Sequence, residues 1–296
     1  MTKIADTDLL INEDGSIYHL KLRPEQIADT IILVGDPGRV YTISDKFDRT
    51  EWQVSNREFL THTGYYRGKR VTVLSTGIGT DNIDIVMNEL DALVNVDFVT
   101  REAKDEKKSL SIIRFGTTGA IQDDIDVGIG TVSAYGLGLD GLLYYYRDCD
   151  MVTEKAMLAA FLEQLQWPSS FPRPYFVSAS PKLLRLFSDD LKVGIAATAP
   201  GFYGPQGRLL RLELTESQII EKIASFRCQD WKVTNFEMET SALYGLGKLL
   251  VHHTVTICAV IANRPRHEYL SNYHPVIHRI AEYILNRITA DTADVP

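Results

Sequence analysis

Residues 109–119 read Ser-Leu-Ser-Ile-Ile-Arg-Phe-Gly-Thr-Thr-Gly, an apolar run followed by a segment rich in glycine and threonine. Two similar arrangements precede it: residues 30–34 run into Gly-Asp-Pro-Gly at 35–38, and residues 70–75 run into Thr-Gly-Ile-Gly at 76–79. Each apolar run predicts a strand, and each polar segment predicts a turn at its carboxyl end. Ligands of α/β sheets bind beyond the carboxyl ends of strands, so a ligand site is expected at these turns.

Strands and helices alternate over most of the chain, which indicates an α/β fold with a parallel or mixed sheet. Further strands are predicted at residues 130–135, 192–198 and 254–261, and helices at residues 81–94, 152–166, 216–226, 238–250 and 275–288. The proline-rich stretch 167–174 and the charged run 101–108 are interpreted as surface segments. We therefore expect a single domain over residues 1–296, with residues 1–17 as an amino-terminal extension.

The composition is that of an ordinary soluble protein, with 45% hydrophobic and 24% charged residues. A formal net charge of −8 disfavours nucleic acid and membranes as partners, so a small anionic ligand has to be held by a local group of arginines. The cysteines Cys149, Cys228 and Cys258 lie far apart and are expected to be unpaired thiols. Because we find neither a signal-peptide core nor an apolar run of about 18 residues, we expect a cytoplasmic protein.

Three arginines lie in or near these segments. Arg39 follows the first turn, Arg57 belongs to a polar segment, and Arg114 lies inside an apolar run. Taken singly, Arg39 and Arg57 are better explained as surface or ion-paired residues than as ligands, whereas an arginine buried in a strand must be paired. Planar guanidinium groups suit a tetrahedral oxyanion such as phosphate. The Gly-x-Gly at 77–79 lacks the remainder of a dinucleotide-binding motif and does not predict such a cofactor.

Three dispersed motifs resemble the nucleoside phosphorylase family in order and spacing. They are Gly-Asp-Pro-Gly-Arg-Val at 35–40, Ile-Arg-Phe-Gly-Thr-Thr-Gly-Ala at 113–120 and Asn-Phe-Glu-Met-Glu at 235–239. The resemblance extends from about residue 18 to the last predicted helix. It implies the fold of that family, which has a central mixed sheet, partly barrel-like, flanked by helices. It also implies a homo-oligomer, at least a dimer and commonly a hexamer.

Two further segments resemble uridine phosphorylases rather than their purine-specific relatives. One is Phe-Tyr-Gly-Pro-Gln-Gly-Arg at 202–208, and the other is Val-Ile-Ala-Asn-Arg at 260–264, where many purine-cleaving relatives carry Ser-Asp. The resemblance implies that uridine and phosphate give uracil and ribose 1-phosphate through an oxocarbenium-like transition state. The alternatives are a phosphorylase for a purine or deoxypyrimidine nucleoside, a hydrolase of the same fold, and a catalytically silent nucleoside-binding protein.

The resemblance implies three groups of site residues. Phosphate would be bound by Gly35, Arg39, Arg57, Arg114 and Thr117. Ribose would be bound by His19, Thr117, Thr118, Met238 and Glu239, with Thr118 favoured over Thr117 next to phosphate and ribose. The base would be bound by Phe202, Gln206, Arg208, Ile261 and Arg264. The catalytic residues would be Arg114, Glu239, Gln206 and Arg208, while His19 and Arg57 would come from a partner subunit.

The chain departs from the family pattern at two places. Asp81-Asn82 stands where Pro-Ser or Ala-Ser is usual, and Gly204-Pro205 stands where Pro-Gly or Glu-Gly is usual. A monovalent cation such as K⁺, known in some uridine phosphorylases, would map to Glu58, Ile78 and Asn82. Because Asn82 replaces the usual serine, the resemblance does not decide whether this chain binds the ion. No cofactor is required, and inorganic phosphate is the expected co-substrate.

Overall fold

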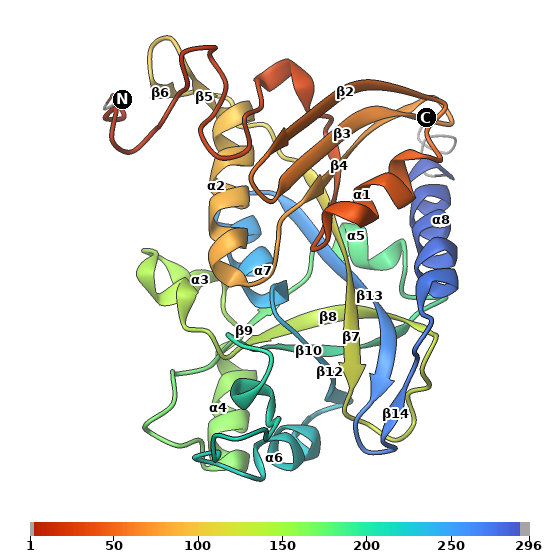
Figure 1. The fold of residues 1–296 in the computed structure, drawn as a ribbon. Coiled ribbons are helices and arrows are strands. Elements are labelled where there is room, and N and C mark those ends of the chain that lie inside the picture. Colours follow the sequence, from red (N-terminus) through yellow and green to blue (C-terminus); the bar gives the residue numbers. More distant parts are fainter. Residues whose placement is uncertain (1–2, 291–296) are drawn as a thin grey trace.

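The computed structural model describes residues 3–290, which form a mixed sheet flanked by helices (Figure 1). The strands are β1 Thr30–Val34, β2 Arg49–Asn56, β3 Phe59–Tyr66, β4 Lys69–Ser75, β5 Val96–Asp97, β6 Glu102–Ala103, β7 Ser111–Ala120, β8 Gly130–Gly138, β9 Tyr175–Ser178, β10 Lys192–Thr198, β11 Arg227–Cys228, β12 Trp231–Glu237, β13 His253–Asn263 and β14 Glu268–Tyr269. The helices are α1 Pro37–Ser44, α2 Thr80–Asn95, α3 Cys149–Val152, α4 Lys155–Leu165, α5 Pro181–Arg185, α6 Ile219–Ser225, α7 Thr240–Leu249 and α8 His274–Ala290.

Part of the sheet closes on itself. Neighbouring strands run in the order β12-β10-β8-β13-β7, and β12 also pairs antiparallel with β7 through Asn235 opposite Ala120 and Phe236 opposite Gly119. This last pairing completes a ring of five strands. From β7 the sheet continues outward as β1-β4-β3-β2, which forms the open part at the top of Figure 1. The prediction of an α/β fold with a partly barrel-like mixed sheet is confirmed.

Strand β7 belongs to both the ring and the open part. It pairs in parallel with β1 on one side and with β13 on the other. The turn predicted after residue 115 is wrong, because β7 continues through residues 116–119 to Ala120. The two threonines of this segment favour extended backbone, and the segment pairs with β13 over its whole length. Glycine at position 116 leaves room for the Arg114 guanidinium, because a Cβ there would lie 2.3 Å from Nη1 of Arg114.

Helices α2 and α7 pack against each other, and α7 also lies against β8 and β13 (Figure 1). Helix α7 begins at Thr240, two residues later than predicted, because the Glu237 carboxylate accepts hydrogen bonds from the backbone N–H groups of Glu239 and Thr240. The helix predicted at 152–166 is α4, which begins three residues later, at Lys155, after the separate short helix α3. Helix α6 is shorter than expected. In the part of the chain that the structure describes, no helix is long and apolar enough to span a membrane.

Candidate active site

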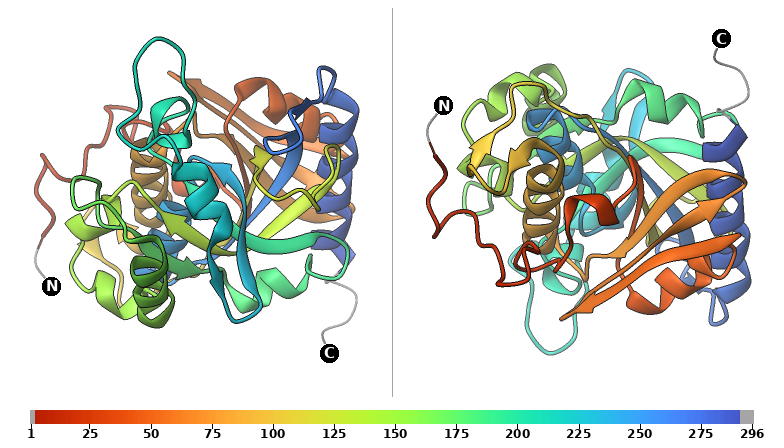
Figure 2. Two further views of the ribbon diagram at one scale, coloured as in Figure 1. Left: turned by 90° about the horizontal axis from the view of Figure 1, so that it is seen from below. Right: turned by 90° about the horizontal axis from the view of Figure 1, so that it is seen from above.

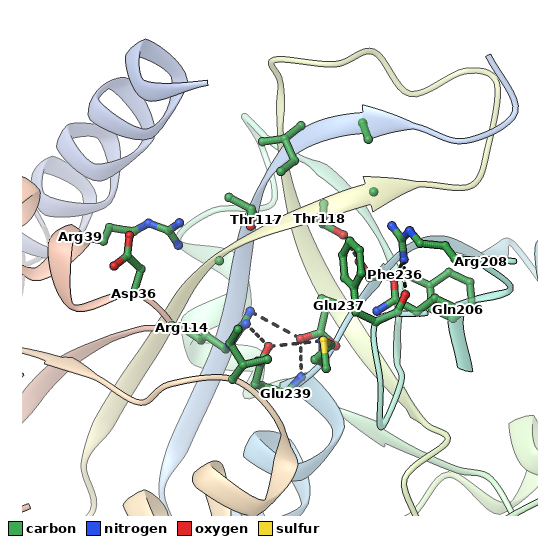
Figure 3. A pocket seen from close by; sticks show the side chains of 18 of the residues that line it. Asp36, Arg39, Arg114, Thr117, Thr118, Gln206, Arg208, Phe236, Glu237 and Glu239 are labelled. Carbon is green, nitrogen blue, oxygen red and sulfur yellow. Dashed lines mark hydrogen bonds and ion pairs between the residues drawn. The ribbon is translucent and has the colours of Figure 1, made fainter. Parts of the chain in front are cut away.

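A cavity of about 990 Å³ lies along β7, within the size range of small-molecule sites (Figure 3). Its walls come from segments 35–39, 77–82, 114–119, 202–208, 236–239 and 261–269. The predicted turns after β1 and β4 both line the cavity. Residues 116–119 of β7, which replace the third predicted turn, line it as well. The first two touch, since a Cβ at Gly35 would lie 3.3 Å from the carbonyl oxygen of Gly77. The cavity therefore forms at the carboxyl ends of parallel strands, as expected.

Buried charges form the floor of this cavity. The Arg114 guanidinium is ion-paired with the Glu239 carboxylate and lies 3.5 Å from the Glu237 carboxylate. Burial disfavours the charged form of Arg114, but the two carboxylates outweigh it and raise the arginine's pKa. Burial also raises the pKa of Glu239, Arg114 opposes that shift, and Glu237 adds to it. The three side chains form one rigid charged cluster (Figure 3).

Backbone groups from two helix starts fix the carboxylates of this cluster. Glu237 accepts a hydrogen bond from the Thr198 hydroxyl at 2.5 Å, in addition to the two N–H groups at the start of α7. Glu239 accepts one from the Gly79 N–H at 2.9 Å, just before α2. Gly79 has a φ of 104°, a conformation that favours glycine. The turn after β4 thus positions a carboxylate that lies 160 residues later in the sequence.

Arg39 lies at the same end of the cavity as Arg114, but its environment differs from that of Arg114. Asp36 caps α1 by accepting the Gly38 N–H at 2.9 Å, and this places Arg39 in the first turn, where Nη1 donates to the Phe115 carbonyl at 3.2 Å. Burial and then the nearby charge of Arg114 lower the pKa of Arg39. Within residues 3–290 we find no ion pair of Arg39 with a carboxylate, so its charge is available to an anion in the cavity.

The two neighbouring threonines of β7 differ in their hydrogen bonds. The Thr118 hydroxyl donates to the Phe236 carbonyl at 2.6 Å and accepts from the Asn235 amide at 2.8 Å. Thr117 is half-buried, lines the cavity beside Arg39 and Arg114, and makes no comparable side-chain bond within the described chain (Figure 3). The sequence favoured Thr118 for ligand binding, whereas these bonds make Thr117 the available hydroxyl.

The opposite end of the cavity is formed by a loop with the short 3₁₀ turn Gly204–Gln206 (Figure 3). Nη1 of Arg208 donates to the Gln206 side-chain oxygen at 2.6 Å and to the Phe202 carbonyl at 2.7 Å. The guanidinium carbon lies 3.8 Å from the centre of the Phe202 ring. Burial, followed by the charge of Arg264, lowers the pKa of Arg208 to about 10. Two cations thus adjoin this end, where an anionic ligand would relieve their repulsion.

Arg264 connects this loop to the end of β13. Its Nη1 donates to the Gln206 carbonyl at 2.9 Å, and its backbone N–H donates to the Ala120 carbonyl at 2.9 Å. Ile261 and Met238 also line the cavity and give it apolar surface. The structure therefore brings together, in one cavity, all predicted site residues except His19 and Arg57.

His19 and Arg57 lie together on the surface, outside the cavity wall. Arg57 Nη2 donates to the Tyr18 hydroxyl at 3.3 Å, and its guanidinium lies over the Tyr18 ring at 5.5 Å. Asn56 donates to the carbonyl of His19 at 2.8 Å.

The residues expected to hold a monovalent cation, Glu58, Ile78 and Asn82, line one edge of the cavity. No group of three or more histidine, cysteine or acidic side chains with metal-binding geometry occurs among the described residues.

Sequence reasoning missed the structural importance of Thr198, Asp36 and Glu237. Glu237 lies two residues before Glu239, and an acid just before a helix is the available signal for its capping role. The Thr198–Glu237 bond joins β10 to the end of β12. A pairing of this kind depends on the closed ring of strands and has no local signature in the sequence.

Comparisons with known proteins show the family and the fold of the chain. A model of the phosphorylase superfamily matches residues 29–284. A uridine phosphorylase of Thermococcus kodakarensis is 31% identical over 257 residues, 87% of this chain and 81% of the relative. A uridine phosphorylase of Haemophilus influenzae is 28% identical over 228 residues, covering 76% and 77%. A Trypanosoma brucei nucleoside phosphorylase described as showing uridine phosphorylase activity superposes with a TM-score of 0.87 at 30% identity, covering 96% of this chain and all of that one.

Proposed function

Because the chain belongs to the phosphorylase superfamily, we propose that it cleaves uridine with inorganic phosphate to give uracil and ribose 1-phosphate. The observation that carries the proposal is the arrangement of arginines in one cavity. Arg39 and Arg114 adjoin one end, and Arg208 adjoins the other beside Gln206. This spacing suits two anions that meet across a sugar, the attacking phosphate and the departing base.

Phosphate binds between the turn after β1 and the middle of β7. The proposed ligands are Gly35, Arg39, Arg114 and Thr117, with Arg57 supplied by a partner subunit. Arg39 supplies a positive charge that is not ion-paired with a carboxylate in the described chain, and the first turn of α1 adds the favourable end of a helix dipole. The hydroxyl of Thr117 adds a neutral donor. Phosphate is held where it can approach C1′ of the ribose.

Ribose lies over the floor of the cavity. Glu239 accepts hydrogen bonds from the ribose hydroxyls, Met238 packs against the sugar, and the Thr118 side chain fixes the adjacent backbone. His19 of a partner subunit binds the 5′-hydroxyl. Since Arg114 and two backbone N–H groups already hold the Glu239 carboxylate, little reorganisation is needed when the sugar binds.

The reaction is a displacement at C1′. The bond from C1′ to N1 of uracil breaks, its electron pair stays on the base, and a phosphate oxygen forms the new bond. In the oxocarbenium-like transition state the sugar is positive, so the negative phosphate beside it stabilises that state and lowers the barrier. The uracil anion is stabilised by donors from Arg208 and Gln206 and takes up a proton after it leaves. A protein general acid is therefore not required.

The base stacks on Phe202 and contacts Ile261, while Gln206 and Arg208 bind its carbonyl and N3 edge. Arg264 holds the loop that carries them.

Asn263 favours a pyrimidine nucleoside over a purine nucleoside as the substrate. Its amide donates to the carbonyls of Gln122 at 2.9 Å and Ile125 at 2.7 Å, so it is a buried neutral anchor. An acid that could protonate a purine is therefore not present at this position.

The proposal includes a homo-oligomer, a dimer or a hexamer of dimers, because His19 and Arg57 lie outside the cavity of their own subunit. It requires no organic cofactor. Glu58 and Asn82 supply oxygen ligands at one edge of the cavity, close to Ile78, which suits a hard monovalent cation such as K⁺. Comparing activity in potassium and tetramethylammonium buffers at equal ionic strength tests that part.

The test of the function is release of free base from uridine, deoxyuridine, thymidine and inosine, each with and without phosphate. Phosphate-dependent release of uracil without release of hypoxanthine is the expected result. Release of hypoxanthine would move the assignment to purines. Base release without phosphate would identify a hydrolase, and tight nucleoside binding without turnover would identify a silent binding protein.

A further inference from the structure

Two carboxylates of α2 are each paired with a histidine ring, and the two rings differ in whether their second nitrogen has a hydrogen-bond partner. Oδ1 of Asp91 lies 3.2 Å from Nε2 of His252, whose other nitrogen accepts the Leu110 N–H at 3.1 Å. Both ring nitrogens of this buried histidine therefore face protein groups. Oε1 of Glu89 lies 2.6 Å from Nδ1 of His19, whose side chain is 27% exposed. In the described chain we find no hydrogen-bond partner for Nε2 of His19.

Glu89 holds His19 by its backbone as well as by its ring. Its carboxylate accepts the N–H of His19 at 3.0 Å and the N–H of Leu20 at 2.8 Å. A carboxylate only accepts hydrogen bonds, so Nδ1 must carry the proton. In the neutral ring, Nε2 is then left as an acceptor. Glu89 therefore fixes the position and the tautomer of the His19 ring, and Nε2 is the ring nitrogen that does not contact Glu89.

This free nitrogen does not serve the cavity of its own subunit. Asn82 lines that cavity near the start of α2, and Glu89 lies seven residues further along. At about 1.5 Å per residue this is roughly 10 Å along the helix axis. Figure 2 shows the amino-terminal segment running along α2 on the outside of the molecule. His19 is accordingly absent from the lining of the cavity in its own subunit.

We propose that Glu89 is a positioning residue that fixes the His19 ring so that Nε2 accepts a hydrogen bond from the 5′-hydroxyl of a nucleoside bound in the partner subunit. The inference rests on the proposed function and deepens it. It makes recognition of the 5′-hydroxyl depend on a helix that contributes to the cavity of its own subunit only through its first turn.

The test compares uridine with 5′-deoxyuridine, which lacks the 5′-hydroxyl, in the full-length Glu89→Gln variant. Glutamine keeps one carbonyl oxygen for the backbone N–H groups but turns an N–H donor toward Nδ1. We expect kcat/KM for uridine to fall about tenfold and kcat/KM for 5′-deoxyuridine to stay within about twofold. In a His19→Ala background, Glu89→Gln should cause no further loss on uridine.

Asp91→Asn is the matched control, because it alters the other carboxylate–imidazole pair on the same helix. It should leave the ratio of the two substrates unchanged, even where it lowers the melting temperature. Equal losses on both substrates in Glu89→Gln, no loss on either, or losses that add to those of His19→Ala would overturn the proposal. If the wild-type protein releases no uracil with phosphate, the proposed function fails first, and the two failures are distinguishable.

Discussion

Arg114 and Arg208 lie at opposite ends of one cavity and have opposite environments. Arg114 is buried on β7 between the carboxylates of Glu237 and Glu239, which raise its pKa against the effect of burial. Arg208 is half-buried on a loop, and burial followed by the charge of Arg264 lowers its pKa to about 10. Arg114 is ion-paired with two carboxylates, whereas Arg208 has no ion pair with a carboxylate among residues 3–290.

This difference indicates a division of labour. In the proposed function, the charged cluster on the closed ring of strands serves phosphate and ribose, which are common to all substrates of nucleoside phosphorylases. In the same proposed function, the loop at residues 202–208 contacts the part that varies, the base. A buried ion pair that loses one member is costly, whereas a half-exposed loop arginine can be removed with little effect on folding. The two ends should therefore respond differently to substitution.

The largest effect is expected for Arg114→Leu. It leaves two buried carboxylates without their cation, so both activity and stability should suffer. We expect activity to fall by at least about a thousandfold and the free energy of unfolding to fall by about 3–5 kcal/mol. Steady-state kinetics and denaturant unfolding measure the two quantities. Loss of activity with unchanged stability would mean that the cluster does not support the fold.

Glu239→Gln should have the next largest effect. The neutral amide weakens the bonds to the ribose hydroxyls, and kcat/KM should fall about a hundredfold or more. Burial raises the pKa of Glu239 above its ordinary value of 4.5, so its reactive carboxylate form is lost on acidification at a pH above that value. The wild-type rate should fall along this acid limb. A pH profile of Glu239→Gln that keeps the same limb would show that another group causes it.

Arg208→Ala should lower kcat/KM for uridine about a hundredfold, because a charged donor to the departing base is lost. The melting temperature should change little, since the side chain is half-exposed and bonded only within its loop. Arg211→Ala is the matched control, three residues beyond the loop, where the residue is exposed, and it should retain activity. A large drop in stability for Arg208→Ala would remove the contrast between the two ends.

The smallest effects separate Thr117 from Thr118. Thr117→Val removes an available hydroxyl and should raise KM for phosphate by roughly five- to tenfold with normal stability. Thr118→Val leaves the Asn235 amide and the Phe236 carbonyl without their shared partner and should cost about 1–3 kcal/mol of stability. Phosphate titrations and thermal melts compare the two variants. The reverse pattern would restore Thr118 as the phosphate-binding hydroxyl.

The sequence predicts strands β1, β4 and β10 well, because each is a short apolar run with a clear end. It does not predict β2, β3 and β12. Strand β2 is mostly exposed, β3 buries polar residues such as His62 and Thr63, and β12 places Lys232, Thr234 and Asn235 among its apolar residues. The turn expected after Phe115 is wrong because pairing with β13 decides the conformation there. Local patterns do not contain such long-range pairings.

The candidate site follows a similar rule. Motifs from the family resemblance identify the side chains that gather in the cavity, and similarity to known phosphorylases confirms the family. They do not reveal which bonds those side chains already make. The engaged hydroxyl of Thr118, the bond from Gly79 to Glu239 and the hold of Glu89 on His19 all join residues distant in sequence.

The most direct test is phosphorus NMR of the wild-type protein with uridine and inorganic phosphate. The division between the two ends predicts that ribose 1-phosphate appears in equal amount to uracil, because the Arg39–Arg114 end holds phosphate against C1′ while the Arg208 end holds the base. Free ribose in place of ribose 1-phosphate would contradict the role given to Arg39 and Arg114.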